Sequence, residues 1–425
     1  MHSGNAVLDA IETKKWGGEL SESVIREVVE GYSLGEVPDY QMSALLMAIF
    51  IRGMGYEETL ALTEAMADSG KQYSFPNCVD KHSTGGVGDK ISLTSLPIVA
   101  ACGAPVAKLS GRGLGTTGGT IDRLTAIPGF SVHLSEERFK KQIEEVGLAI
   151  TEAGDVAPAD RAIYALRDAT GTVDSLSLIG SSIVSKKAAT GAGHLLYDVK
   201  SGSGAFMKTI EEARELAELL VRLSESAGIE ASALVTNMDE PLGVAVGNAL
   251  EVRESARFLR GEASTNDLSE VAHVVAVRLL RLKGIPEPEG AVEKAISSGA
   301  AYEKFREFVA AQDGDAGALE NLPVSGEVRE VGAPQAGHVA QMGALSIGRA
   351  ALLLGAGRVK KGDEGDPGVG IEVLVKAGRE VEEGQPVARL YGRRNVERAR
   401  ELVLEALKIS DTPVERPPAI LGSLE

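Results

Sequence analysis

Two glycine-rich segments hold the side chains best suited to bind an anion. The first segment, residues 80–92, has three glycines within four positions, together with Lys81, Ser83 and Ser92. Glycine allows positive φ and close backbone approach, so amide N–H groups can converge on an anion, to which the lysine and the serines add donors. The residue order matches neither a nucleoside-triphosphate loop nor a dinucleotide-binding loop. The pattern predicts a site for a single phosphate, with a plain tight turn as the alternative.

A second glycine-rich segment, residues 110–120, begins eighteen residues after Ser92. It carries the hydroxyls of Ser110 and Thr120 at its two ends. One strand–turn–strand excursion could return the chain to the first segment over this distance, so we expect both segments to contact the same anion. Two converging loops would be more selective than one.

Donors suited to a planar heterocycle are clustered further along the chain. Ser182 and Lys186 are four residues apart, which places them on one face of a helix, and Arg167 precedes them. Together they could donate hydrogen bonds to the carbonyl oxygens of a heterocyclic ligand. The spacing alone also fits an ordinary solvated surface, because Arg and Lys side chains are mostly exposed.

The segments around these residues alternate between helical and strand-like patterns. Apolar residues at helical spacing predict a small helical module over residues 21–70. Residues 77–119 contain short apolar runs between glycine-rich turns, which indicates strands that feed loops and helices. Capped helices at 135–147 and 209–228 alternate with further strand-like runs, which predicts an α/β domain with a largely parallel sheet. The apolar runs are residues 91–93, 98–101, 106–109, 195–199 and 233–236.

The pattern changes near residue 330. Short alternating stretches separated by glycine-rich turns predict a hairpin-rich antiparallel piece, so we expect a third, C-terminal α+β domain. Residues 376–384 are similar to a hairpin of a biotinyl-type barrel. The modifiable lysine tip is missing, so we interpret this hairpin as structural.

Charge and composition narrow the class of protein. The net charge is −17, the wrong sign for a broad surface that binds nucleic acid or anionic lipid. Two cysteines are too few for a disulfide framework and fit a reducing compartment. No apolar run has the length of a membrane span, and residues 1–15 lack the pattern of a signal peptide. We therefore expect a cytoplasmic protein with no nucleic-acid or membrane partner.

The glycine-rich segments belong to a series of longer motifs. The motifs are residues 80–92, 110–124, 127–130, 157–160, 164–168, 182–187, 198–207 and 247–254. They closely resemble the thymidine phosphorylase and pyrimidine-nucleoside phosphorylase family, and the resemblance covers nearly the whole chain.

The resemblance implies an enzyme for reversible phosphorolysis, in which phosphate attacks the anomeric carbon of a pyrimidine nucleoside and releases the base and a pentose 1-phosphate. Breaking the glycosidic bond puts negative charge on the base, so donors at its carbonyls assist the reaction. The implied phosphate-binding residues are Lys81, Ser83, Ser92, Ser110 and Thr120. The implied base-binding residues are His82, Arg167, Ser182 and Lys186, with an apolar wall of Val173, Ile183 and Phe206. The catalytic residues among them are His82, Arg167 and Lys186, and we expect His82 to donate to O2 of the pyrimidine.

The resemblance also implies the architecture and the partners. Hinges would join a small helical domain to a larger α/β domain, and their closure would expel water. Relatives are homodimers, so we expect a homodimer. The resemblance implies no cofactor, and inorganic phosphate acts as the second substrate. The expected domains are residues 1–70 with 156–190 (helical), 71–155 with 191–329 (α/β) and 330–425 (C-terminal).

Lys90 departs from the pattern of some relatives. Some bacterial members bind a potassium ion, which here would involve Gly88, Lys90, Leu242, Ala245 and Glu254. The ammonium of Lys90 could sit where the ion would sit and pair with Glu254, so we expect that no monovalent cation is needed. Thr116, Gly171 and Ser177 also depart from the family pattern, and these three bear on substrate preference rather than on reaction class.

Two other functions fit parts of the sequence. A phosphoribosyltransferase similar to the anthranilate enzyme also has a glycine loop followed by Asp, but it needs pyrophosphate and magnesium sites built on acidic motifs. A catalytically silent nucleoside-binding protein could lose His82 or Lys186, and both are present. The sequence leaves open the working direction and the choice among thymidine, uridine and deoxyuridine, because such discrimination rests on contacts worth only ~1–3 kcal/mol.

Overall fold

The chain forms two compact units and enters each of them more than once. The computed structural model describes residues 5–113, 118–262, 267–324, 327–357 and 365–425. Unit 1 comprises Met1–Cys78, Ala153–Leu195 and Glu215–Ala231, and unit 2 comprises Val79–Glu152, Leu196–Arg214 and Ser232–Glu425.

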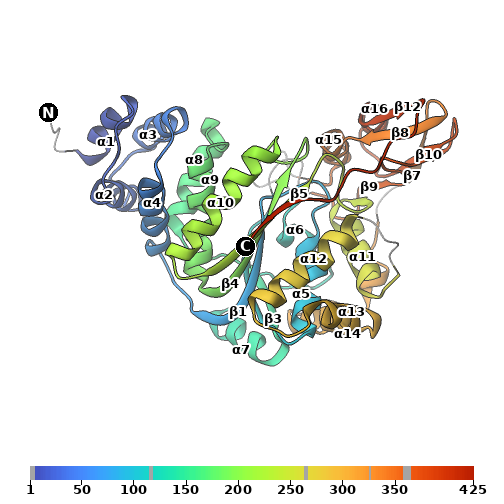
Figure 1. Cartoon of the computed structure of the whole chain (residues 1–425), viewed down its shortest axis with the longest axis horizontal. Helices are drawn as coiled ribbons and strands as arrows, with labels where there is room; N and C mark the ends of the chain where they lie inside the picture. Colours follow the sequence, from blue (N-terminus) through green and yellow to red (C-terminus); the bar gives the residue numbers. More distant parts are fainter. Residues whose placement is uncertain (1–4, 114–117, 263–266, 325–326, 358–364) are drawn as a thin grey trace. The chain divides into compact units, whose positions relative to one another are not determined.

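Unit 1 is a helical bundle, which confirms the helical module expected from the apolar spacing (Figure 1). In its second helix, Ser21 caps the N-terminus and Ile25, Val28 and Val29 face the core. The helices are α1 (Ala6–Lys15), α2 (Glu22–Ser33), α3 (Asp39–Arg52), α4 (Tyr56–Asp68), α8 (Pro158–Thr170), α9 (Leu176–Thr190) and most of α10 (Ile210–Ser226).

A six-stranded sheet runs through unit 2 in the order β13-β5-β4-β1-β2-β3. Val79 pairs with Val106, and Val106 pairs with Leu148, so three neighbouring strands are parallel. The last strand of the chain is antiparallel to its neighbour β5 and extends the sheet at its edge. The strands are β1 (Phe75–Ser83), β2 (Val106–Ser110), β3 (Leu148–Glu152), β4 (Ala192–Ser201), β5 (Glu230–Asn237) and β13 (Ile420–Leu424).

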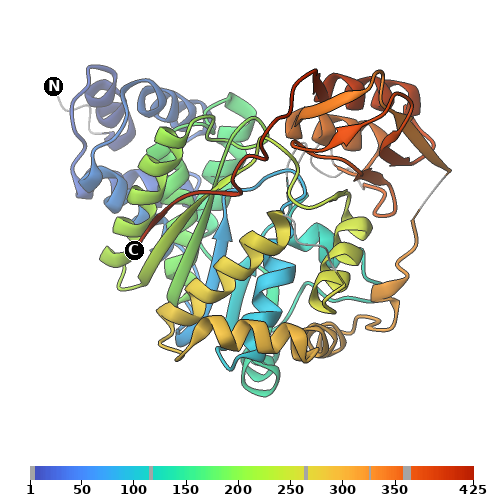
Figure 2. The same ribbon diagram turned by 45° about the vertical axis from the view of Figure 1, so that its right-hand side comes forward.

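Helices of unit 2 cover the sheet and pack on one another (Figure 2). The helix that follows β1 is central, because four later helices of the described chain contact it. The helix that follows β1 is α5 (Ile91–Ala101). The other helices of this part are α6 (Thr120–Leu124), α7 (Glu136–Val146), α11 (Asn248–Leu259), α12 (Asp267–Leu282), α13 (Pro288–Ser297) and α14 (Ala300–Ala311), followed by the short 3₁₀ helix η1 (Ala318–Glu320).

The helix α5 corrects one sequence interpretation. Residues 91–93 and 98–101, which we expected as strand-like runs, belong to this single helix. All ten residues from Ile91 to Ala100 are buried, so no polar face marks the helical period in the sequence. The chain therefore passes from β1 to β2 through a helix rather than through a strand–turn–strand excursion, as parallel neighbours require.

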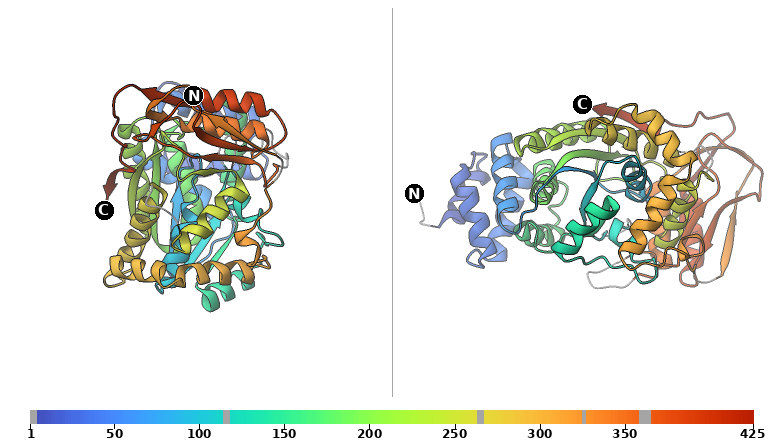
Figure 3. Two further views of the ribbon diagram at one scale, coloured as in Figure 1. Left: turned by 90° about the vertical axis from the view of Figure 1, so that its right-hand side faces the viewer. Right: turned by 90° about the horizontal axis from the view of Figure 1, so that it is seen from below.

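The C-terminal part of unit 2 forms two small antiparallel sheets, with orders β10-β8-β12 and β6-β9-β11-β7, of which the short strand β6 comes from earlier in the chain. Figure 3 shows the orange-to-red chain from β7 to β12 gathered at one end of the unit, whereas the dark-red β13 belongs to the six-stranded sheet. The expected fold class is confirmed: a helical bundle, an α/β part with a mostly parallel sheet, and a hairpin-rich C-terminal part. The elements are β6 (Ala245–Val246), β7 (Val328–Gly332), β8 (Gly337–Met342), α15 (Ala344–Leu354), β9 (Gly370–Val373), β10 (Glu380–Val381), β11 (Pro386–Tyr391), α16 (Val396–Ala406) and β12 (Leu407–Ser410).

Across the described ranges, no helix combines the length and the apolar composition that a membrane span requires.

Candidate active site

The five residues predicted to bind phosphate lie at strand ends and helix starts of unit 2. Lys81 and Ser83 are in the last three residues of β1, and Ser110 ends β2. Because these strands are parallel neighbours, their carboxyl ends share one edge of the sheet. Ser92 lies in the first turn of α5, and Thr120 is the first residue of α6. Helix N-termini present unpaired N–H groups and partial positive charge, which favours an anion.

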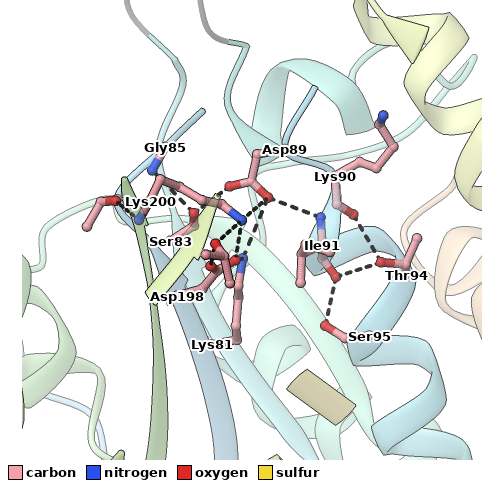
Figure 4. Close-up of polar contacts among 12 residues, drawn as sticks. Lys81, Ser83, Gly85, Asp89, Lys90, Ile91, Thr94, Ser95, Asp198 and Lys200 are labelled. Atoms are coloured by element: carbon pink, nitrogen blue, oxygen red, sulfur yellow. Dashed lines mark hydrogen bonds and ion pairs between the residues drawn. The ribbon is translucent and has the colours of Figure 1, made fainter. Parts of the chain in front are cut away.

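Lys81 is buried in a group of two lysines and two aspartates (Figure 4). Its Nζ lies 3.2 Å from Asp198 Oδ2 and 3.8 Å from Asp89 Oδ1. Lys200 Nζ lies 2.8 Å and 3.9 Å from the same two oxygens. Ser83 donates a hydrogen bond to the other oxygen of Asp89 and accepts one from the Gly85 amide at 3.2 Å.

The ion pairs keep two of these buried groups, Asp89 and Lys200, charged. Burial opposes ionisation of Asp89, but attraction to Lys200 and Lys81 outweighs it and holds the pKa of Asp89 far below its ordinary value. Burial likewise disfavours the charge on Lys200, and Asp198 and Asp89 outweigh it, which raises the pKa of Lys200. The formal charges of the two lysines and the two aspartates cancel within the group.

Asp122 shapes the second glycine-rich segment. One of its carboxylate oxygens accepts hydrogen bonds from Gly113 N at 2.6 Å and Gly119 N at 2.9 Å, which draws the two ends of the loop together. A Cβ atom at Gly119 would lie 2.4 Å from Gly113 N, so only glycine fits there. Sequence reasoning gave Asp122 no role. Residues 114–117 of this segment, including Thr116, lie outside the described residues.

Arg167, the first predicted base-binding residue of unit 1, is buried and bound to the backbone. It donates to the carbonyls of Leu178 at 2.8 Å, Val173 at 2.7 Å and Thr172 at 3.3 Å. Burial lowers its pKa from the ordinary value. The guanidinium thus anchors the turn between α8 and α9. That turn begins at Gly171, which has a φ of +66° and ends α8 in the left-handed conformation.

Ser182 and Lys186 share one face of α9, as their spacing predicts. Lys186 Nζ donates to Ser182 Oγ at 2.9 Å and forms an ion pair with Asp160, near the start of α8. The side chain of Asp160 is buried, whereas that of Lys186 is 32% exposed. Lys186 is thus held by unit 1 and reaches its surface.

The remaining predicted residues divide between the units. In unit 1, Ile183 is buried and Val173 is partly buried. In unit 2, His82 is partly buried on β1 with its ring edge-to-face against Tyr197, at 6.3 Å between ring centres, and Phe206 is exposed.

The Lys90 ammonium is enclosed by oxygen atoms of unit 2. It donates to Leu242 O at 2.7 Å, Ala245 O at 3.0 Å and Glu254 Oε2 at 2.7 Å, so the expected pair with Glu254 is present. Gly88 adjoins this group, because a Cβ atom there would lie 2.8 Å from Leu242 O. The Lys90 ammonium thus occupies the oxygen atoms that a potassium ion at this place would need.

The fold and these loops define a class of glycosyltransferase. Residues 8–70 match the helical bundle domain of a glycosyl transferase family, and residues 75–302 match its a/b domain. Residues 338–410 match the pyrimidine nucleoside phosphorylase C-terminal domain.

Relatives with known names extend along the whole chain. The pyrimidine-nucleoside phosphorylase of Geobacillus stearothermophilus is 42% identical over 98% of this chain and 99% of its own length. That of Bacillus subtilis (strain 168) is 44% identical over 95% and 96%. A thymidine phosphorylase of Mycobacterium tuberculosis is 45% identical over 97% of each chain. The chain belongs to the pyrimidine-nucleoside phosphorylase family, and it is a pentosyltransferase.

A solved structure outside this group shares the fold. Anthranilate phosphoribosyltransferase from Thermus thermophilus has a TM-score of 0.57 and 23% identity, over 72% of this chain and 99% of its own. At that identity the similarity describes the fold alone, so it lends no support to the phosphoribosyltransferase alternative.

Proposed function

We propose that the enzyme catalyses the reversible phosphorolysis of thymidine, uridine or deoxyuridine to the free base and a ribose or deoxyribose 1-phosphate. The observation that carries the proposal is the set of donors at one edge of the sheet. Lys81 and Ser83 lie at the end of β1, Ser110 ends the adjacent parallel strand β2, and Ser92 lies in the first turn of the helix between them. One ammonium, hydroxyls and helix-terminal amides are the groups that bind a phosphate dianion.

In the proposed reaction, a phosphate oxygen bonds to the anomeric carbon as the bond from that carbon to N1 of the base breaks. The bonding electrons stay on the base and spread onto its carbonyl oxygens. The sugar carries positive charge in the transition state, which the bound phosphate stabilises. Catalysis therefore depends on groups that bind this charge distribution more tightly than the substrate.

We assign the base side to His82, Arg167, Ser182 and Lys186. His82 donates to O2 of the pyrimidine, while Arg167 and Lys186 stabilise the remaining negative charge. A guanidinium has five N–H donors, and Arg167 spends three on backbone carbonyls, so two remain by count for a ligand. Val173, Ile183 and Phe206 form the apolar wall near the 5-position.

The test is release of uracil or thymine, followed by ultraviolet absorbance with and without phosphate. We expect release only with phosphate, and His82→Ala should lower kcat about 100-fold at an unchanged unfolding temperature. No release from any of the three nucleosides would contradict the proposal and favour a silent binding protein. Turnover of anthranilate with 5-phosphoribosyl pyrophosphate and magnesium would instead establish the phosphoribosyltransferase. Parallel assays on the three nucleosides determine the preference.

We also propose that the enzyme needs no monovalent cation, because the Lys90 ammonium supplies the charge among Leu242, Ala245 and Glu254. Activity should be equal in potassium-free and potassium-containing buffers of the same ionic strength. Activity that collapses without potassium and returns with it would refute this.

Lys90→Met should lower the free energy of unfolding by about 3–5 kcal/mol, because it leaves the buried Glu254 carboxylate without its cationic partner. Chemical denaturation measures this loss.

We also propose that the protein forms a homodimer through a surface of unit 1. Exposed apolar residues gather on α1 and α3 and at their ends, including Trp16 at 74%, Tyr40 at 74% and Ile51 at 68% exposure. Ile51→Asp should convert dimer to monomer in sedimentation experiments, whereas Val328→Asp, at an exposed apolar position of unit 2, should not. A dimer that survives Ile51→Asp at micromolar concentration would place the interface elsewhere. We propose a cytoplasmic location because two cysteines are too few for the disulfide framework typical of an oxidising compartment.

A further inference from the structure

Lys200 is a buried cation to which the proposed reaction assigns no role. It lies near the end of β4, with a fully buried side chain. Its Nζ donates to Thr236 Oγ1 at 3.0 Å, and Thr236 in turn donates to Asp198 Oδ1 at 2.6 Å. Its backbone amide donates to Thr84 Oγ1 at 2.9 Å, within the first glycine-rich segment. Lys200 therefore pairs with the carboxylates of Asp198 and Asp89 through its ammonium group, and it contacts the first glycine-rich segment through its backbone amide.

Lys200 and Lys81 share the same two counter-ions. Both ammonium groups face Asp198 Oδ2 and Asp89 Oδ1, and Lys200 is the nearer of the two to Asp198, at 2.8 Å against 3.2 Å (Figure 4). Two aspartates and two lysines give this group no net charge. Without Lys200, Lys81 would be the only lysine facing two buried carboxylates.

The balance matters because phosphate arrives with its own negative charge. A buried group with two carboxylates and one ammonium would carry a net charge of −1 and would repel a dianion, while drawing Lys81 toward Asp198. A second ammonium cancels that charge. The three N–H donors of Lys81 are then less strongly held by the aspartates and can turn to a ligand.

We propose that Lys200 is a positioning residue for phosphate: it supplies the positive charge that Asp198 and Asp89 require and so leaves Lys81 available to the anion. This inference rests on the proposed placement of phosphate at Lys81. Lys200 acts through Lys81 and the aspartates, not by contact with phosphate.

The experiment measures phosphate saturation of the full-length enzyme at saturating nucleoside. Lys200→Met should raise the KM for phosphate at least tenfold, with kcat at saturating phosphate and the nucleoside KM each within about threefold. The double variant Lys200→Met with Asp198→Asn restores a neutral group and should recover most of the loss. Lys14→Met removes a buried lysine paired with Glu58 in unit 1, and it should leave the phosphate KM unchanged.

Each outcome has a distinct meaning. An unchanged phosphate KM in folded Lys200→Met overturns the inference, as does an equal rise in both KM values that the double variant does not correct. If Lys200→Met fails to fold, inorganic phosphate is titrated into the charge-balanced double variant by calorimetry. A Kd within fivefold of the wild-type value is expected, and a weakening of tenfold or more overturns the inference. If Lys81→Met leaves the phosphate KM unchanged, the proposed phosphate site itself fails.

Discussion

Lys81 in unit 2 and Lys186 in unit 1 each pair with a buried aspartate, but their surroundings differ. Lys81 is almost fully buried, faces two carboxylates and has a second lysine beside it. Lys186 is about one-third exposed, pairs with Asp160 and donates a hydrogen bond to the hydroxyl of Ser182. Among the described residues, one lysine lies in a buried, charge-balanced group, and the other lies at a surface with a single carboxylate partner.

The difference corresponds to the charge of the ligand proposed for each lysine. Phosphate is charged before the reaction begins, so its site must have compensated charges and preset donors in the absence of the ligand. A pyrimidine is neutral when it binds and gains charge only as the glycosidic bond breaks. A partly solvated lysine can meet that transient charge without a permanent group of counter-ions.

The largest expected effect is on the phosphate side. Lys81→Met should lower kcat/KM for phosphate about 10³-fold, or about 4 kcal/mol, because the ammonium is the formal charge in the site. The nucleoside KM should change little. Steady-state kinetics with varied phosphate measure the effect, with Lys14→Met as the control for losing a buried lysine–carboxylate pair. A loss below tenfold would remove Lys81 from the phosphate site.

On the base side the expected effect is smaller and falls on kcat. Lys186→Met should lower kcat about 100-fold, since its interaction strengthens in the transition state, and leave the phosphate KM within threefold. The control is Lys140→Met, a partly exposed lysine paired with Glu136, which should retain wild-type kinetics. An effect confined to KM would show that Lys186 binds the base without stabilising its charge.

The smallest effect is on acid stability. The pKa of Asp89 is held below its ordinary value, so the folded protein keeps this carboxylate charged while the unfolded chain takes up a proton. Its stabilisation is present above about pH 4 and is lost as the pH falls further, by at most about 1.4 kcal/mol per pH unit. Asp89→Asn should therefore flatten the decline in unfolding free energy between pH 4 and pH 3.

The control for that prediction is the exposed Asp313, whose pKa is lowered by Arg138. Asp313→Asn should change the slope less than Asp89→Asn, because solvent screens an exposed pair. Equal slopes in the two variants and the wild type would show that the buried charge group does not control acid unfolding.

Capping residues and helical spacing in the sequence correctly predicted helix ends and helix faces, because these features depend on residues close together in the chain. Ser135 and Gly147 mark a helix that begins at Glu136 and ends at Val146, and Ser135 caps it as expected. Thr209 and Glu212 exchange hydrogen bonds as a capping box at the start of α10. The four-residue spacing of Ser182 and Lys186 likewise needs only a helix.

The parts that sequence reasoning missed depend on long-range contacts. The helix α5 is buried on all sides, so the sequence shows no alternation of apolar and exposed polar residues at helical spacing. Lys200 meets Asp89 only because β4 and β1 are neighbours in the sheet, an order that spacing does not reveal. The sequence did contain a signal for this contact. Asp198 and Lys200 are two residues apart on one strand, so their side chains point to the same face of the sheet.

The most direct test of the account is a crystal structure of the enzyme with phosphate and uracil. We predict an anion within hydrogen-bond distance of Lys81 Nζ and of the hydroxyls of Ser83 and Ser92, at the carboxyl ends of β1 and β2. An anion bound elsewhere, with Lys81 still held only by Asp198 and Asp89 at saturating phosphate, would contradict the account.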